Sequence, residues 1–242
     1  LPQQMSCSMS SPVRGATVAR LVAASSAHPP THTALPSEKM KMRNRLSRTL
    51  AVLLVVASAS ALLAACTPTP PPDGSLPCNS SIDVQRAVGF DVSLEAQLPV
   101  AGWSAVPTQV DSGRECSEAR LGPLWGAGVR ELRSAGAIFD NPDRTGYTLV
   151  VYRANELTLD ALAYAFERGA RGGRKTQDIR TSDEFVNGWP AFRMTLINGD
   201  HRQVIVLFAV PSEAPLVRGV LTSDLPDAEV SAVVQEYSDA IK

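Results

Sequence analysis

The sequence predicts an α+β fold in which an antiparallel β-sheet is flanked by helices. Two patterns support this prediction. Several segments carry apolar residues with period two or in short apolar runs, as strands do, and two of them lie on either side of Asn198-Gly199. Two other segments, one after Thr158 and one after Pro226, carry apolar residues at helical spacing. Because a hairpin is antiparallel, we expect the helices to pack on an antiparallel sheet.

The first half of the folded part contains four expected strands. In the segment 92–98, apolar and polar residues alternate up to Pro99. This alternation predicts a strand with one face exposed to solvent. The segments 102–106, 132–139 and 147–152 are also expected to be extended. The stretch 120–133 mixes glycine with apolar residues and is open to either a helix or a loop.

The first expected helix begins after Thr158, whose side chain is placed to cap it, with Asp160 near the positive end of the helix dipole. Gly172-Gly173 ends it. Its apolar stripe consists of Leu159, Leu162, Phe166 and Ala170.

A hairpin and a last helix complete the expected fold. The arms 191–197 and 203–210 flank Asn198-Gly199, a dipeptide that readily adopts the positive φ angles of a tight turn. The second arm is apolar on both faces and is therefore expected to be a central strand. A strand at 216–222 and a helix from 224–227 onward follow. The apolar stripe of that helix is formed by Val230, Val233, Val234, Tyr237 and Ile241.

The charge is distributed unevenly along the chain. Residues 1–65 hold 7 of the 23 Lys and Arg and one acid, Glu38, so residues 66–242 carry 16 basic and 23 acidic side chains, a net charge of −7. This balance excludes a basic nucleic-acid-binding domain. A hydrophobic content of 44% excludes a disordered chain.

The region 40–65 has the features of an export signal. After a start at Met40 or Met42, four basic residues precede an uncharged apolar run, 50–65, that is short for a membrane span. Residues 1–39 lie upstream of this complete signal, begin with Leu1 and show no periodicity. We expect them to be a non-native upstream extension.

The end of this run, Leu63-Ala64-Ala65-Cys66, resembles the lipobox of bacterial lipoproteins. The resemblance implies that Cys66 becomes the first mature residue and carries a diacylglyceryl thioether and an N-acyl chain such as palmitate. Two or more acyl chains hold a protein stably on a bilayer. The protein is then expected on the extracytoplasmic face of the cell membrane. An uncleaved helix with a buried cysteine is the alternative interpretation.

A proline-rich tether, 66–77, separates the anchor from the expected single domain, 78–242. Cys78 and Cys116 are an even pair in an exported domain, where a structural disulfide is the default. A redox or metal-binding role is the alternative, but neither a Cys-x-x-Cys spacing nor a nearby histidine supports it.

The order of these elements resembles the PsbP-like fold of the LpqN-type lipoproteins of actinobacteria. The resemblance covers about residues 90–242 and is carried by Leu98-Pro99 before Gly102-Trp103, by the helix after Leu157, by the segment 187–191 and by the helix from Pro226. It implies an α/β sandwich without a known catalytic centre, in a family of envelope binding or assembly modules. The segment 114–133, with Cys116, has no counterpart in that pattern.

Few residues are suited to catalysis or cofactor binding. The only histidine after residue 65 is His201, beside the expected turn, and there is no Gly-x-Ser-x-Gly motif, phosphate-binding glycine loop or zinc ligand set. We therefore expect no cofactor, no metal and no enzymatic activity. Carboxylate-only hydrolysis stays open as an alternative. The acids available for it are Asp140, Asp143, Asp183, Glu184 and Asp200.

Two features are candidates for a binding surface. Trp125, between glycines and a proline, either lines a groove or packs into the core, whereas Trp103 and Trp189 are expected in the core. The second feature is a basic cluster that either binds anionic headgroups or wall phosphates or is a solvated helix end. It consists of Arg168, Arg171, Arg174 and Lys175.

The sequence therefore predicts a membrane-anchored, non-catalytic binding or assembly module of the cell envelope, whose partner is an envelope protein or lipid. One alternative is a carrier or sensor of a hydrophobic envelope molecule, which requires an apolar cavity between sheet and helix. The other is a carboxylate-dependent hydrolase of wall glycans, which requires two acids that face each other in a cleft.

Overall fold

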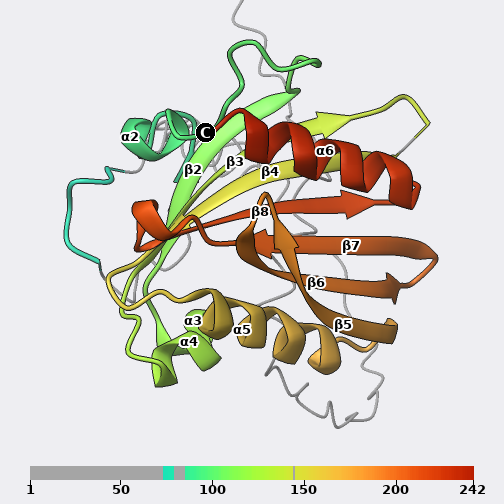
Figure 1. Cartoon of the computed structure of the whole chain (residues 1–242). Coiled ribbons are helices and arrows are strands. Elements are labelled where there is room, and N and C mark those ends of the chain that lie inside the picture. Colours follow the sequence, from blue (N-terminus) through green and yellow to red (C-terminus); the bar gives the residue numbers. More distant parts are fainter. Residues whose placement is uncertain (1–72, 79–84, 144) are drawn as a thin grey trace, which may run out of the picture. The chain divides into compact units, whose positions relative to one another are not determined.

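Eight antiparallel strands form a single sheet in the computed structural model, in the order β1-β2-β3-β4-β8-β7-β6-β5 (Figure 1). The structure describes residues 73–78, 85–143 and 145–242. The strands are β1 (Gln85–Ala87), β2 (Gln109–Glu115), β3 (Leu132–Asp140), β4 (Gly146–Arg153), β5 (Thr176–Val186), β6 (Trp189–Asn198), β7 (His201–Phe208) and β8 (Leu216–Ser223). The described residues belong to one compact unit.

Helices cover both faces of this sheet. They are α2 (Val92–Glu95), α3 (Glu118–Leu121), α4 (Pro123–Gly126), α5 (Leu159–Gly172) and α6 (Asp227–Asp239). Figure 1 shows α5 next to α3 and α4. The helix α6 lies in that view over the strands β4 and β8. The mixed α+β class is thus confirmed, although the described domain is mostly sheet.

Each face of the sheet has its own hydrophobic core. On the α5 side, Leu162 and Phe166 of the helix pack with residues of the sheet such as Met194 and Leu207. On the α6 side, Val230 and Tyr237 pack with another set of sheet residues, which includes Val204, Val206, Phe208 and Val220. Alternate residues of β7 therefore enter opposite cores, and the strand is central, as predicted.

The local patterns were interpreted correctly where apolar spacing was strong. The expected strands at 132–139, 147–152 and 216–222 lie within β3, β4 and β8. In α5, the Thr158 side chain accepts a hydrogen bond from the backbone N–H of Ala161, and Gly173 is the C-terminal cap. The final helix begins at Asp227. The undecided stretch 120–133 contains the end of α3, all of α4, a loop and the start of β3.

The hairpin turn lies one residue later than expected. Asn198 pairs with His201, so the two turn residues are Gly199 and Asp200. Gly199 has a φ of +64°. A positive φ at the first turn position is typical of a type II′ hairpin, in which glycine is favoured.

Two expected strands were wrong. Residues 92–95 form α2, which begins because the Asp91 side chain accepts a hydrogen bond from the backbone N–H of Leu94, 3.0 Å away. The two buried residues of this segment, Leu94 and Leu98, are four positions apart, a spacing that fits a helical turn as well as a strand. The segment 102–106 is a loop of turns and bends rather than a strand.

Replacing Leu207 by Ala should lower the free energy of unfolding by about 2–5 kcal/mol, because the fully buried side chain leaves a cavity next to α5. The control is Thr181→Ala on the exposed strand β5, which should change that free energy by no more than about 0.5 kcal/mol. Urea unfolding followed by circular dichroism measures both. Equal effects would contradict the assignment of β7 to the core and β5 to the surface.

Candidate functional site

The strand β5 lies at one edge of the sheet and pairs only with β6. It follows α5 after a short turn and ends at Asn187-Gly188, where both residues have positive φ angles, +53° and +82°. The pairing register shifts between Gln177 and Arg180, where Asp178 has a φ of +55°. This is a β-bulge, and aspartate is one of the residues that tolerate such a φ. Beyond the bulge, from Arg180 onward, the strand pairs regularly with β6.

The register of β5 with β6 determines which face each side chain occupies. Thr181 and Asp183 pair with Met194 and Phe192, which belong to the core under α5, so they lie on the α5 side. Residues 180, 182 and 184 alternate with them and lie on the α6 side. Phe185 is on the α5 side and is 77% exposed, which is unusual for a large apolar side chain on a strand.

The side chains of β5 contact the rest of the domain only through apolar packing, by Ile179 on the α5 side and Val186 on the α6 side. In the part of the chain that the structure describes, no side chain from 177 to 185 makes a hydrogen bond or an ion pair. Four of these residues are charged, namely Asp178, Arg180, Asp183 and Glu184. On its outer edge, this eleven-residue strand has backbone N–H and C=O groups without a neighbouring strand. On both of its faces it has charged side chains that form no ion pair within the described domain.

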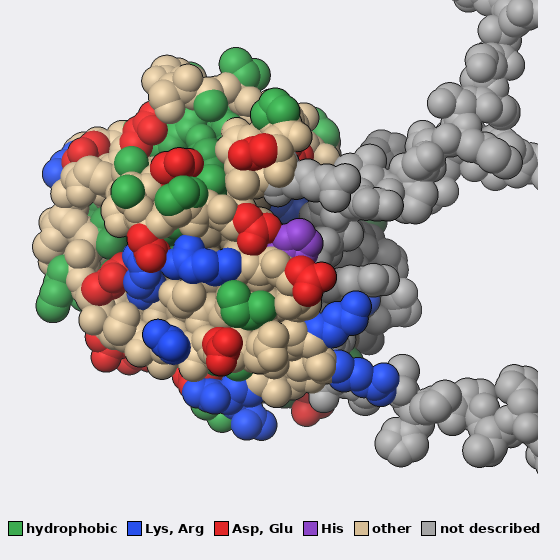
Figure 2. All heavy atoms as spheres, turned by 90° about the vertical axis from the view of Figure 1, so that its right-hand side faces the viewer, with side chains coloured by type: hydrophobic (Ala, Val, Ile, Leu, Met, Phe, Trp, Pro, Cys, Tyr) green, Lys and Arg blue, Asp and Glu red, His purple; other side chains and the backbone are tan. Residues whose placement is uncertain are grey.

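A polar pocket of about 530 Å³ adjoins this strand on the α6 side. Asp178 and Arg180 line it together with Arg193 and Arg202. The Nη2 atoms of Arg193 and Arg202 lie 2.9 Å and 2.6 Å from Oδ1 of Asp227, at the start of α6. Figure 2 shows basic and acidic side chains interspersed on the surface rather than separated into patches. A lining of this composition suits polar groups rather than a hydrophobic molecule.

Of the predicted binding residues, Trp125 is engaged within the domain. Its ring packs against the core under α5 and is covered by Arg130, whose guanidinium carbon lies 4.2 Å from the ring centroid. Trp103 donates a hydrogen bond from Nε1 to the hydroxyl of Tyr147 (3.0 Å), and Trp189 stacks on Phe208. Both of these contribute to the core on the α6 side, as expected.

The predicted basic cluster is divided between the end of α5 and the turn that follows it. Arg168 and Arg171 are exposed on the helix, and Arg171 pairs with Glu167 at 2.6 Å, one helical turn earlier. Arg174 and Lys175 are exposed in the turn before β5. This arrangement favours the solvated helix end, because part of the positive charge is neutralised within α5.

His201, the first residue of β7, is exposed and pairs with Asp224, with Nδ1 2.6 Å from Oδ2. Burial acts to raise the pKa of Asp224, but the hydrogen bonds from His201 and from the backbone N–H of Arg202 outweigh it and lower that pKa below its ordinary value. Ser223 approaches Asp224 rather than the imidazole. The sequence did not reveal this pair, because the two residues are 23 positions apart.

The acids considered for hydrolysis are not arranged as a catalytic pair. The pKa of Asp143 is lowered by hydrogen bonds from Thr145, whereas a general acid needs a raised pKa. Asp183 and Glu184 are neighbours on β5 and therefore point to opposite faces of the sheet. Asp140 is exposed and accepts a hydrogen bond from Thr108.

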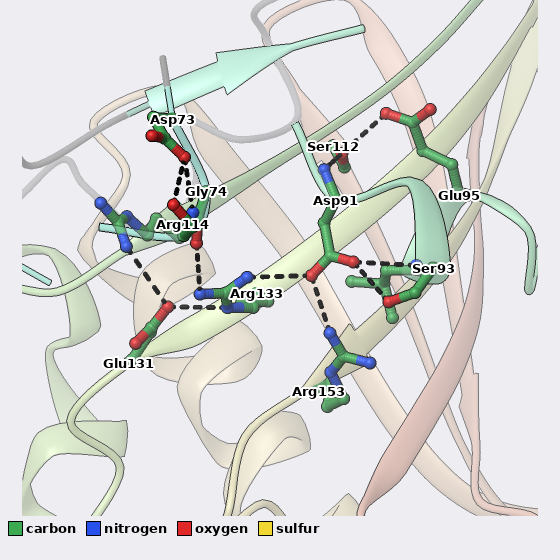
Figure 3. Close-up of polar contacts among 12 residues, drawn as sticks. Asp73, Gly74, Asp91, Ser93, Glu95, Ser112, Arg114, Glu131, Arg133 and Arg153 are labelled. Atoms are coloured by element: carbon green, nitrogen blue, oxygen red, sulfur yellow. Dashed lines mark hydrogen bonds and ion pairs between the residues drawn. The ribbon is translucent and has the colours of Figure 1, made fainter. Parts of the chain in front are cut away.

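A charge network at the opposite side of the sheet was not foreseen from the sequence (Figure 3). Asp91 is buried, and its Oδ2 accepts hydrogen bonds from Arg133 of β3 (3.1 Å) and Arg153 of β4 (2.7 Å). Arg133 also donates to the backbone oxygen of Gly74 (2.9 Å), and Arg114 donates to that of Leu76. The network therefore joins the segment 73–78 to three strands of the sheet.

The cysteine pair reinforces this attachment. Cys78 and Cys116 form a disulfide with their Cα atoms 5.8 Å apart, as predicted. Cys116 directly follows β2, so the bridge joins the start of the folded domain to the sheet.

The remaining predicted features concern membranes and metals. No helix among the described residues has the length and hydropathy needed to span a bilayer. The same residues contain no group of three or more His, Cys, Asp or Glu side chains that could hold a metal ion. Cys66, the regions 1–39 and 40–65 and most of the tether 66–77 lie outside the described residues.

A scan against protein-family models finds no match for this chain, and a search of curated proteins finds none either. The site must therefore be interpreted from its own geometry.

Replacing Asp91 by Asn should destabilise the domain by about 2–3 kcal/mol at pH 7, because it weakens two charged hydrogen bonds and a helix cap. Burial acts to raise the pKa of Asp91, but hydrogen bonds from Ser93, Arg133 and the Leu94 N–H and the charge of Arg153 outweigh it, so the pKa lies below 3.8. The stability that the carboxylate contributes is therefore complete above this ordinary value and is lost as the pH falls through the lowered pKa.

The difference between the wild type and the Asp91→Asn variant should accordingly shrink below about pH 4. Urea unfolding at pH 7, 5 and 3 measures it. Asp200→Asn in the exposed hairpin turn is the control and should change stability little at any of these values. A difference that stays constant down to pH 3 would contradict the role given to the Asp91 charge.

Proposed function

We propose that this protein is a binding or assembly module of the cell envelope that is anchored by lipid on the extracytoplasmic face of the membrane and acts without catalysis. The observation that carries this proposal is the open edge strand β5, whose side chains from 177 to 185 have no polar partner among the described residues. The edge of a sheet is a common site of protein recognition, because a partner strand can extend it by main-chain hydrogen bonds.

The two edges of the sheet differ in how well they suit such a partner. As described, β1 has three residues, and its middle residue, Arg86, is engaged with Asp111 and Ser134. The strand β5 has eleven residues, and both of its faces are largely exposed. Natural proteins usually shorten or cover an edge of this length, so one that is left open is a candidate interface.

The alternative functions receive less support from the geometry. A carrier of a hydrophobic molecule needs space between the sheet and its helices, yet large side chains such as Leu162, Met194, Phe208 and Tyr237 are almost completely buried there. The pocket beside β5 is polar. A carboxylate hydrolase needs two converging acids, and the candidate acids do not form such a pair.

The resemblance to the PsbP-like fold is compatible with an antiparallel sheet covered by helices on both faces. It supports the proposal, because that family is generally regarded as envelope binding or assembly modules. The Cys78–Cys116 disulfide supports an oxidising compartment outside the cytoplasm. The signal-like region 40–65 and Cys66 support a lipid anchor.

The anchor is tested by growing cells with an alkyne-labelled fatty acid. The wild-type protein should incorporate the label, and the Cys66→Ala variant should not, because it lacks the acceptor thiol. Thr67→Ala, one residue later, is the matched control and should be labelled like the wild type. Label on the Cys66→Ala variant, or none on the wild type, would contradict lipidation at this position.

The binding surface is tested by placing a photo-crosslinking amino acid at Thr181 of β5 in the anchored protein. Irradiation of intact cells should give a discrete crosslinked product, whose composition mass spectrometry determines. The control position is Val106, which is 89% exposed in a loop outside β5 and should give no such product. A product from position 106 but none from 181 would refute β5 as the binding surface.

A further inference from the structure

We infer that β5 pairs with β5 of a second copy of this chain, in antiparallel orientation around a twofold axis at Ser182, so that the two sheets become continuous. This inference rests on the proposed function, since it names the partner of the same surface. The order of the residues along β5 supports it, and so does the lack of polar partners for its charged side chains among the described residues.

A twofold axis perpendicular to the sheet keeps each face with its equivalent and pairs residues at equal distances on either side of the axis. With the axis at Ser182, Arg180 of one copy lies opposite Glu184 of the other, and this pair occurs twice on the α6 side. Ile179 lies opposite Phe185, and this pair occurs twice on the α5 side. Thr181 lies opposite Asp183, a polar pair without opposite charges. The stretch 179–185 thus offers one apolar pair and one pair of opposite charges, each occurring twice.

The neighbouring registers lack this match. Moving the axis to Thr181 places Asp178 opposite Glu184, two like charges, and Ile179 opposite Asp183. Moving it to Asp183 places Arg180 opposite Val186 and leaves no pair of opposite charges. Because directly opposite charges stabilise a strand pair and like charges destabilise it, the charges of β5 select the register at Ser182.

The structure of the single chain agrees with this pairing. The bulge, formed by Asp178 and Ile179, marks one end of the stretch 179–185, and regular pairing with β6 begins at Arg180, the first residue of the charged pair. Arg180 and Glu184 make no ion pair within the described part of their own chain, and Phe185 is 77% exposed. Each of these groups would gain its missing contact from the second copy.

Charges on an edge strand often prevent edge-to-edge pairing. Here their order allows pairing in one register, so they restrict the choice of partner. A lipid anchor would confine both copies to one membrane and raise their effective concentration, so a weak contact between the domains is sufficient.

Charge reversal tests the pairing. The chain from Asp73 onward, exported to an oxidising periplasm, contains both cores and the disulfide, and circular dichroism verifies that each variant is folded. In sedimentation equilibrium the wild type should form a dimer. Arg180→Glu and Glu184→Arg should each weaken dimerisation at least about tenfold, because two attractive pairs become repulsive.

The two variants provide their own control. An equimolar mixture of Arg180→Glu and Glu184→Arg should form a heterodimer, since every glutamate then faces an arginine. The double variant should dimerise within about threefold of the wild type, because its pairs are attractive again. A wild type that stays monomeric up to millimolar concentration, or a mixture that stays as monomeric as its components, would overturn the inference.

A cysteine on the axis reports the register directly. The two copies of a Ser182→Cys variant would have Cα atoms about 4.5–5.5 Å apart, within disulfide reach. Mild oxidation should therefore give a covalent dimer on a non-reducing gel, and the Arg180→Glu change should suppress it. Gln177→Cys, which lies far from its symmetry mate in this register, should give none. Equal crosslinking at both positions would overturn the register.

The outcomes separate this inference from the proposed function. If the photo-crosslinker at Thr181 captures a different protein while the domain stays monomeric and Ser182→Cys does not crosslink, the binding module stands and the self-pairing is refuted. If position 181 captures nothing and the domain stays monomeric, both fail. A product at 181 composed of two copies of this chain supports both.

Discussion

The structure depends on the need to bury both faces of one antiparallel sheet. The central strands β4, β8 and β7 carry apolar residues on both sides, which only a helix layer on each face can cover. The helix α5 fills one layer and α6 the other, and their apolar stripes provide the matching surfaces. The positions of the loops, the disulfide and the edge strands all follow from this arrangement.

The helices cover the two edges of the sheet less completely than its centre, and the two edges differ in their polar contacts. Beside β1 and β2 there is a hydrogen-bond network. Asp91 accepts hydrogen bonds from Arg133 and Arg153, and Arg133 donates one to the backbone oxygen of Gly74. Charged hydrogen bonds of this kind add to the apolar cover that the short helix α2 gives to this part of the sheet. At β5 the side chains from 177 to 185 make no hydrogen bond or ion pair with other described residues, so no charge network forms there.

The strands and helices that could be predicted from the sequence are those in which the local spacing of apolar residues is distinct. The strand β7 was recognised from its continuous apolar run, and the helix α5 from apolar residues at helical spacing. The segment 92–98 was misinterpreted because Leu94 and Leu98 satisfy both periods, and the Asp91 cap decided between them. The strands β2 and β5 were missed because their polar side chains hide the alternation, and β5 gains its strand conformation mainly from pairing with β6.

The contacts of the candidate site could not be predicted, because local spacing does not show which distant residues meet. Charges that act together in space, such as Asp91 with Arg153, are 62 positions apart in the chain, so composition cannot pair them. Conversely, the basic residues that adjoin in sequence, from Arg168 to Lys175, include one, Arg171, whose charge is paired with Glu167 of the same helix. The charges of β5 contribute no polar contact to the fold, and they can therefore change without loss of stability. In an edge strand of this kind, the residues that bind a partner are not those that stabilise the fold. The order of charges along the strand can therefore be determined by the partner alone.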